Sequence, residues 1–107
     1  MTQTTLEQLL TELTRRCHAN SLAKGFWKDK GVKFYPEKIA LIHSELSEAL
    51  EELRKPHPSI AAVEEEFADT IIRILDLAGH MNLNLGMAIC NKMRINEGRP
   101  YKHNKRF

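Results

Sequence analysis

Four acidic residues of the sequence have the side-chain type and the spacing that a metal site requires. Glu45 and Glu48 are three residues apart, and so are Glu66 and Asp69. Side chains at this spacing lie one turn apart on the same side of a helix. Carboxylate oxygens are the ligands that Mg²⁺ and Mn²⁺ prefer, and carboxylates held close together repel one another unless a cation compensates them. The four residues are therefore candidate ligands of a divalent metal ion.

Two prolines between the pairs predict the turn that brings them together. Pro56 and Pro58 break the helical pattern, because proline lacks an N–H group and clashes with the preceding turn. We expect an antiparallel hairpin of helices over residues 35–54 and 58–81, the second starting at Pro58. At a rise of about 1.5 Å per residue, the four carboxylates then fall within a slab about 8 Å tall. The alternative is a solvated acidic face, on which the same spacings are common.

Apolar periodicity predicts two further helices, over residues 4–22 and 84–97, the last capped by Asn82 or Asn84. The apolar stripes of the hairpin comprise Ile39, Ile42, Leu46, Leu50 and Leu53 in one helix and Val63, Phe67, Ile71, Ile74, Ala78 and Met81 in the other. We predict a single all-α domain over residues 1–107. It is a four-helix antiparallel bundle-like domain with a central metal-binding helix hairpin, completed by oligomerisation.

The chain is short for the apolar surface that it carries. A lone domain of 107 residues buries only a modest share of its surface. Leu41 and Ile72 lie outside the main stripes, so apolar surface is left for a second copy. A two-fold dimer is the commonest way to bury such surface.

Composition argues against several other classes of protein. No run approaches the roughly 18 to 20 apolar residues that a membrane span needs, and the first residues, MTQTTLEQLL, lack a basic region and a signal-peptide core. Cys17 and Cys90 have no CxxC or close Cys/His spacing, which disfavours a zinc site or a disulfide. We expect a cytoplasmic protein with two reduced thiols and no membrane partner.

The net charge of +2 is unevenly distributed along the chain. Residues 37–69 hold nine acidic and three basic residues, a net charge of −6, whereas residues 91–107 hold six basic residues and one acidic residue, a net charge of +5. An acidic centre followed by a basic tail suits a site where cations and phosphates meet. The alternative is an acidic face and a basic tail that are both simply solvated.

Two motifs resemble those of the MazG-like all-α NTP pyrophosphohydrolases, whose pattern is EExxE followed by ExxD. Here the pattern is SELSE at 44–48 and EFAD at 66–69, with Ser44 in place of the first glutamate. The segment 92–101 resembles the family's KxxxN…R motif, so the resemblance covers about 37–107. It implies Mg²⁺-dependent hydrolysis of a nucleoside triphosphate, or a related nucleotide, to the monophosphate and pyrophosphate, in nucleotide-pool housecleaning. It also implies a homodimer or homotetramer.

The resemblance implies a role for each carboxylate. Glu45, Glu48, Glu66 and Asp69 would hold Mg²⁺, with Mn²⁺ as an alternative ion. Either Glu45 or Glu48 would accept the proton of the attacking water and act as the catalytic base. The sequence does not choose between these two glutamates.

Other residues are candidates for binding the nucleotide itself. Lys92, Asn96 and Arg99 recur at helical spacing and end just beyond the predicted helix, where they suit a polyphosphate. A basic helix end favoured by the helix dipole is the alternative. Trp27 and Phe34 are candidates for stacking a base, with core packing as the alternative, and Tyr101 is expected to close over the nucleotide.

Two rival functions remain open on the sequence alone. One is a catalytically silent helical dimerisation or regulatory protein that keeps the fold. The other is a nucleic-acid-binding module that uses the basic tail KMRINEGRPYKHNKRF. The acidic segment weakens the second rival, because it would repel a phosphate backbone.

Overall fold

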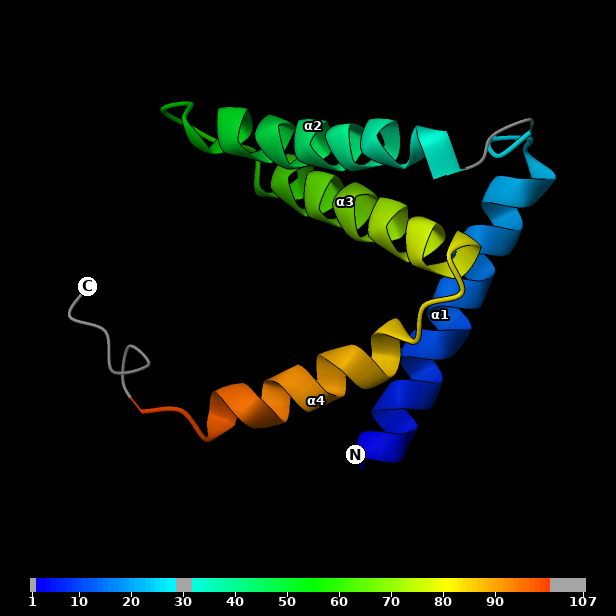
Figure 1. The fold of residues 1–107 in the computed structure, drawn as a ribbon. Coiled ribbons are helices and arrows are strands. Elements are labelled where there is room, and N and C mark those ends of the chain that lie inside the picture. Colours follow the sequence, from blue (N-terminus) through cyan, green and yellow to red (C-terminus); the bar gives the residue numbers. More distant parts are fainter. Residues whose placement is uncertain (1, 29–31, 101–107) are drawn as a thin grey trace.

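The chain is all-α in the computed structural model, which describes residues 2–28 and 32–100. Figure 1 shows α1 (Gln3–Ala23), α2 (Tyr35–Leu53), α3 (Ile60–His80) and α4 (Leu85–Glu97), with the short 3₁₀ helix η1 (Val32–Phe34) leading into α2. The described residues contain no strand. The predicted helices agree with the observed ones to within two residues at each end.

Side-chain caps explain where two of the helices begin. Helix α3 begins after Ser59, whose Oγ accepts a hydrogen bond from the backbone N–H of Ala62 at 3.2 Å. The expectation that Pro58 starts this helix was therefore wrong, because the hydroxyl of Ser59 satisfies a free N–H group that proline cannot. Of the two asparagines considered for α4, Asn84 is the cap, and its side chain accepts from the N–H of Met87 at 3.1 Å.

Glu52 ties the end of α2 to the start of α3. Its Oε2 accepts a hydrogen bond from the backbone N–H of Ser59 at 2.9 Å, and its Oε1 accepts one from Lys55 Nζ at 2.9 Å. The hydrogen bond from Ser59, followed by that from Lys55, lowers the pKa of the Glu52 carboxyl. This carboxylate closes the hairpin turn that sets the register of α2 against α3.

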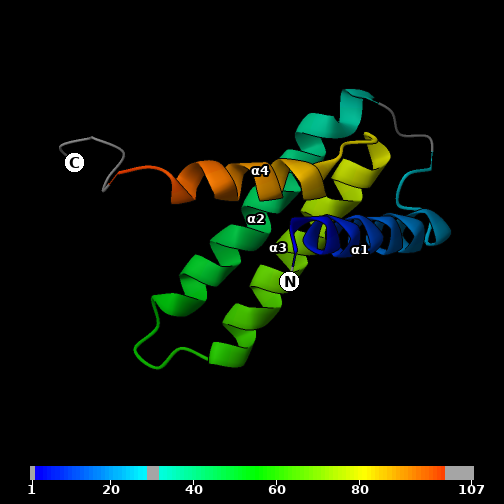
Figure 2. The ribbon, with the colours of Figure 1, turned by 90° about the horizontal axis from the view of Figure 1, so that it is seen from below.

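The four helices do not form a closed bundle within one chain. Helices α2 and α3 pack side by side as the expected antiparallel hairpin, and α1 packs against α3 at one end and against α4 at the other. Helix α4 contacts mainly α1. It extends away from α1 in a direction different from that of the α2–α3 hairpin, as Figures 1 and 2 show. Helix α1 therefore connects two parts that have little contact with each other.

Two glycines allow α1 to approach its neighbours closely. A Cβ atom at Gly79 in α3 would lie 2.7 Å from Cβ of His18, and one at Gly86 in α4 would lie 3.0 Å from the carbonyl oxygen of Glu7. The distance at Gly79 is shorter than real Cβ contacts allow, so a larger residue there would force α1 outward, and the distance at Gly86 is tight enough to require a small shift of α1. These contacts fix the crossing of α1 over α3 and α4.

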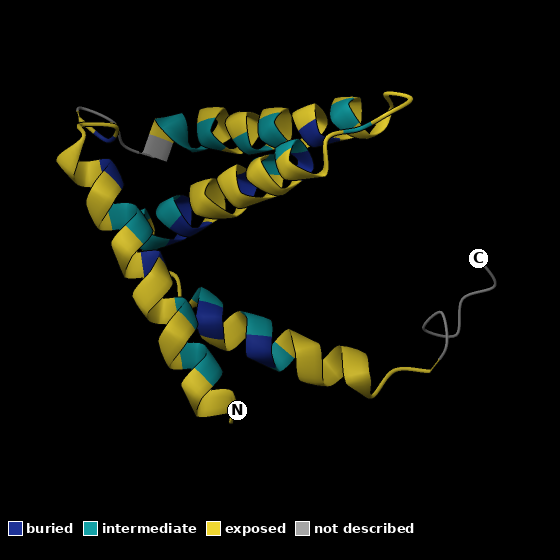
Figure 3. Cartoon of the chain, turned by 180° about the vertical axis from the view of Figure 1, so that it is seen from behind, coloured by how far each residue is buried: buried dark blue, intermediate teal, exposed yellow. Residues whose placement is uncertain are grey.

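Much of each helix is exposed in a single chain (Figure 3), and the exposed residues include many of the apolar side chains predicted to be core. Val63 and Ala78 are buried, but Leu46, Leu50 and Phe67 are 49%, 57% and 47% exposed. Cys17 and Cys90 are free thiols, as expected. None of the described helices is both long enough and apolar enough to cross a membrane.

Candidate metal centre

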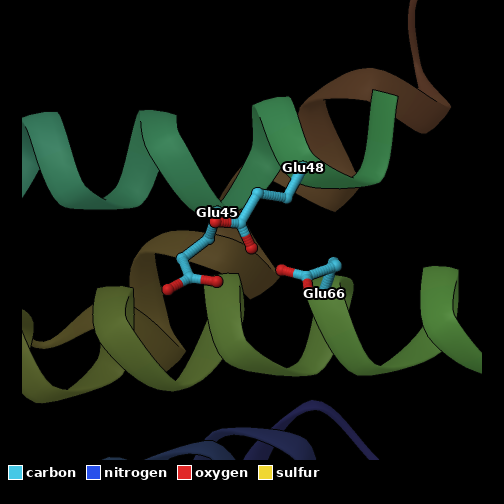
Figure 4. A group of neighbouring side chains, drawn as sticks. All are labelled: Glu45, Glu48 and Glu66. Carbon is cyan, nitrogen blue, oxygen red and sulfur yellow. The ribbon is translucent and has the colours of Figure 1, made fainter. Parts of the chain in front are cut away.

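Three carboxylates from the two hairpin helices converge in the space between α2 and α3. Oxygen atoms of Glu45, Glu48 and Glu66 all lie within 4.8 Å of one another. Figure 4 shows Glu45 and Glu48 descending from α2 toward Glu66, which rises from α3. The hairpin register therefore brings together three of the four residues that the sequence suggested as ligands.

Glu66 is the carboxyl group most affected by this arrangement. Its Oε2 atom is buried and has no hydrogen-bond partner among the described residues. Partial burial, followed by the proximity of Glu45 and Glu48, raises the pKa of Glu66 to about 7. Both causes disfavour the ionised form of the group. The cluster thus holds more negative charge than its surroundings compensate. A bound proton or a metal ion would neutralise part of this charge.

Arg73 provides a positive charge at the edge of the cluster, and it was not among the site residues expected from the sequence. Its Nε donates to Oε1 of Glu45 at 3.1 Å, and the side chains of Arg73 and Glu45 are 41% and 18% exposed. A signal for it exists in the sequence, because Arg73 stands seven residues after Glu66 and so returns to the same face of α3. Arg73 neutralises part of the charge of Glu45 and leaves Glu66 beside Glu48.

Asp69, the fourth expected ligand, lies outside the close group of three. It is exposed on α3 and lines a cavity of about 270 Å³ together with Glu45 and Arg73. Asp76 and Phe26 also line this cavity. Asp69 therefore borders the same space as the cluster, but it is not one of the three residues whose oxygens lie within 4.8 Å of one another.

Trp27 belongs to a packed group of polar and aromatic side chains. It is 5% exposed, its ring stacks on that of His80 with 3.8 Å between centroids, and Lys38 Nζ lies 4.5 Å from its centroid. Its Nε1 donates to Oδ1 of Asp76 at 2.9 Å, and this oxygen also lies 2.8 Å from Nδ1 of His18. A base stacking on Trp27 would have to displace His80 or Lys38. The group attaches Trp27, which follows α1 in the chain, to α1 and α3.

The phosphate contacts expected from α4 do not lie beside the carboxylates of the same chain. Lys92, Asn96 and Arg99 are exposed, on α4 or just beyond it, and α4 packs on α1 instead of the hairpin. Phe34 is half-buried in η1, with Lys33 Nζ 5.3 Å from its ring centroid. Tyr101 and the rest of the basic tail lie outside the described residues.

Comparison with known proteins finds no family model that matches the chain, no curated protein similar to it in sequence and no similar solved structure. A cluster of hard oxygen donors with a carboxyl group of raised pKa can bind a divalent cation, hold a proton, or do both in alternation.

Proposed function

We propose that this chain is a Mg²⁺-dependent nucleotide pyrophosphohydrolase. It would cleave a nucleoside triphosphate, or a related nucleotide, to the monophosphate and pyrophosphate, in nucleotide-pool housecleaning. The observation that carries the proposal is the convergence of Glu45, Glu48 and Glu66 within 4.8 Å on the hairpin. The resemblance of the same segments to the MazG-like pattern supports the choice of reaction.

The residues of the cluster fit a hard divalent cation. All of the donors are carboxylate oxygens, which favour Mg²⁺ or Mn²⁺ over softer metals. The buried Oε2 of Glu66, which has no partner among the described residues, has a free coordination position. A bound ion would supply a Lewis acid that neutralises phosphate charge and makes water more acidic. Asp69, one turn along α3 and bordering the adjoining cavity, would complete the ligand set.

Glu48 is the better placed of the two candidate bases. Arg73 occupies Oε1 of Glu45, whereas no cation pairs with Glu48 in the part of the chain that the structure describes. Glu48 is also the exposed member of the cluster, so it has access to water. We assign to Glu48 the acceptance of the proton from the attacking water.

The exposed apolar surface supports assembly of a homodimer or homotetramer. A groove of about 400 Å³ on the hairpin is lined by His43, Leu46, Ser47, Ala49, Leu50, Leu53 and Phe67. An apolar surface of this kind on a short chain is usually covered by another subunit. Packing of two hairpins would complete a four-helix arrangement. It would also allow Lys92, Asn96 and Arg99 of one copy to approach the carboxylates of another.

A turnover screen tests the proposed reaction. The purified chain is incubated with canonical and modified nucleoside triphosphates and Mg²⁺, and released pyrophosphate and monophosphate are measured. We expect equal amounts of the two products from at least one nucleotide, and no release in EDTA. Release of orthophosphate in place of pyrophosphate would contradict the assigned bond cleavage. No release from any nucleotide would favour a catalytically silent helical protein.

A further inference from the structure

Arg73 borders two neighbouring cavities that have different chemical character. One, of about 270 Å³, is lined by Glu45 and Asp69 and belongs to the carboxylate side. The other, of about 400 Å³, is lined by Lys38 and Trp27. Phe26 and Asp76 also line both cavities. Arg73 therefore stands between the candidate metal centre and a space that contains a second cation.

The guanidinium group of Arg73 has donors left for a ligand. Arginine carries five N–H donors, and Arg73 uses Nε on Glu45. Within the described residues its two Nη atoms have no hydrogen-bond partner, and the side chain is 41% exposed. A guanidinium group with free Nη atoms can hold two oxygens of a phosphate group in parallel.

Lys38 supplies the second cation of the same cavity. Its Nζ lies 4.5 Å from the ring centroid of Trp27, a cation–π contact that holds the lysine in place. Asp76 also lines this cavity, but its Oδ1 already accepts the Trp27 indole N–H and contacts His18. Lys38 and Arg73 are therefore two cations that line this cavity beside the single carboxylate of Asp76.

From this arrangement we infer an anion subsite between Lys38 and Arg73 that takes a phosphate group of the ligand, with Arg73 as a positioning residue that also orients Glu45. The inference rests on the proposed metal site, since Glu45 is one of its ligands. A carboxylate has two oxygens, so Arg73 can hold one while the other faces a metal ion. Arg73 then contacts both the candidate metal ligand Glu45 and the anion subsite, and the phosphate contacts come from α2 and α3, in addition to any from α4.

Calorimetry distinguishes the role of Arg73 in binding a phosphate group from its role in orienting the metal ligand Glu45. Mn²⁺ alone is titrated into wild-type protein and into Arg73→Ala, and inorganic pyrophosphate is then titrated at fixed free Mg²⁺ and again in EDTA. We expect Arg73→Ala to weaken pyrophosphate binding by about tenfold or more, since charge-assisted hydrogen bonds are lost. Mn²⁺ affinity should stay within about fivefold, because a partly exposed ion pair contributes little. Lys38→Ala should weaken pyrophosphate binding less.

Two further variants make the result specific. Arg73→Lys keeps the charge but loses the paired donors, so it should restore only part of the pyrophosphate affinity. Arg54→Ala is the matched control, because Arg54 forms an exposed pair with Glu51 at 3.1 Å on the same hairpin, and it should behave as wild type. Unchanged pyrophosphate binding in Arg73→Ala, or parallel loss of Mn²⁺ and pyrophosphate, would overturn the subsite. Pyrophosphate binding in EDTA that requires Arg73, without Mn²⁺ binding, would support the subsite and contradict the metal centre.

Discussion

Glu48 on α2 and Glu66 on α3 bring carboxylate oxygens within 4.8 Å of each other across the hairpin. Two ionised carboxylates at this distance repel each other, and the repulsion is reduced when one of them is protonated or when a cation binds between them. Partial burial, followed by the proximity of Glu45 and Glu48, raises the pKa of Glu66 to about 7. Protons and metal ions should therefore compete for the same cluster.

The raised pKa predicts that the metal-free protein loses stability as the pH rises. The Glu66 carboxyl binds its proton more tightly in the folded chain than in the unfolded one, so the free energy of unfolding falls between pH 4.5 and about 7. The Glu66→Gln variant lacks this titration and should melt at a higher temperature than wild type above pH 7. Thermal melts in EDTA at several pH values measure the effect. A pH dependence equal to that of wild type would contradict it.

The close approach of Gly79 to His18 predicts a stability defect on substitution. In Gly79→Ala the new methyl group would start 2.7 Å from Cβ of His18, so α1 and α3 must separate, at a cost of about 1–3 kcal/mol. Denaturant unfolding measures the loss. Gly98→Ala is the control, because its nearest atom would be 3.6 Å away, and a defect as large in that variant would remove the packing explanation.

Mixing two inactive variants tests whether a site is shared between copies. Glu48→Gln removes the proposed base, and Arg99→Ala removes a proposed phosphate contact on the basic segment after α4. If one copy's Arg99 serves another copy's Glu48, an equal mixture in a dimer should regain roughly a quarter of wild-type turnover, since half of the dimers are mixed and each has one intact site. No recovery after subunit exchange would mean that each chain forms its own site.

The helices and the hairpin were predictable because local signals specify them. Prolines at 56 and 58 break the helical pattern, and Asn84, one of the two expected caps, marks the start of α4. The start of α3 was misplaced at Pro58, because the cap of Ser59 was not recognised. The crossing of α1 over α3 and α4 was not predictable, because it depends on Gly79 and Gly86 meeting residues far away in the sequence. Periodicity alone also does not say whether an apolar stripe is buried within one chain or between two.

The candidate site was predicted in part, and helix geometry explains the rest. Asp69 is turned about 60° from Glu66 around the axis of α3, whereas Arg73, seven residues on, is turned only about 20°. Arg73 therefore faces α2 and meets Glu45, while Asp69 turns toward the adjoining cavity. The three-residue spacing of Glu66 and Asp69 was interpreted as placing both on one face of α3. The rotation of about 60° between them is enough to place Asp69 beside the carboxylate cluster and not within it.

Pyrophosphate release with Mg²⁺ by wild type, Glu48→Gln and Asp69→Asn, with Glu51→Gln as the control, tests the candidate metal centre. Glu51 lies on the same helix but pairs with Arg54 in solvent, so its removal should leave turnover unchanged. We predict that Glu48→Gln and Asp69→Asn lower turnover by about 100-fold or more while circular dichroism shows an intact helical fold. Turnover near the wild-type rate in both variants would contradict a catalytic metal centre on this hairpin.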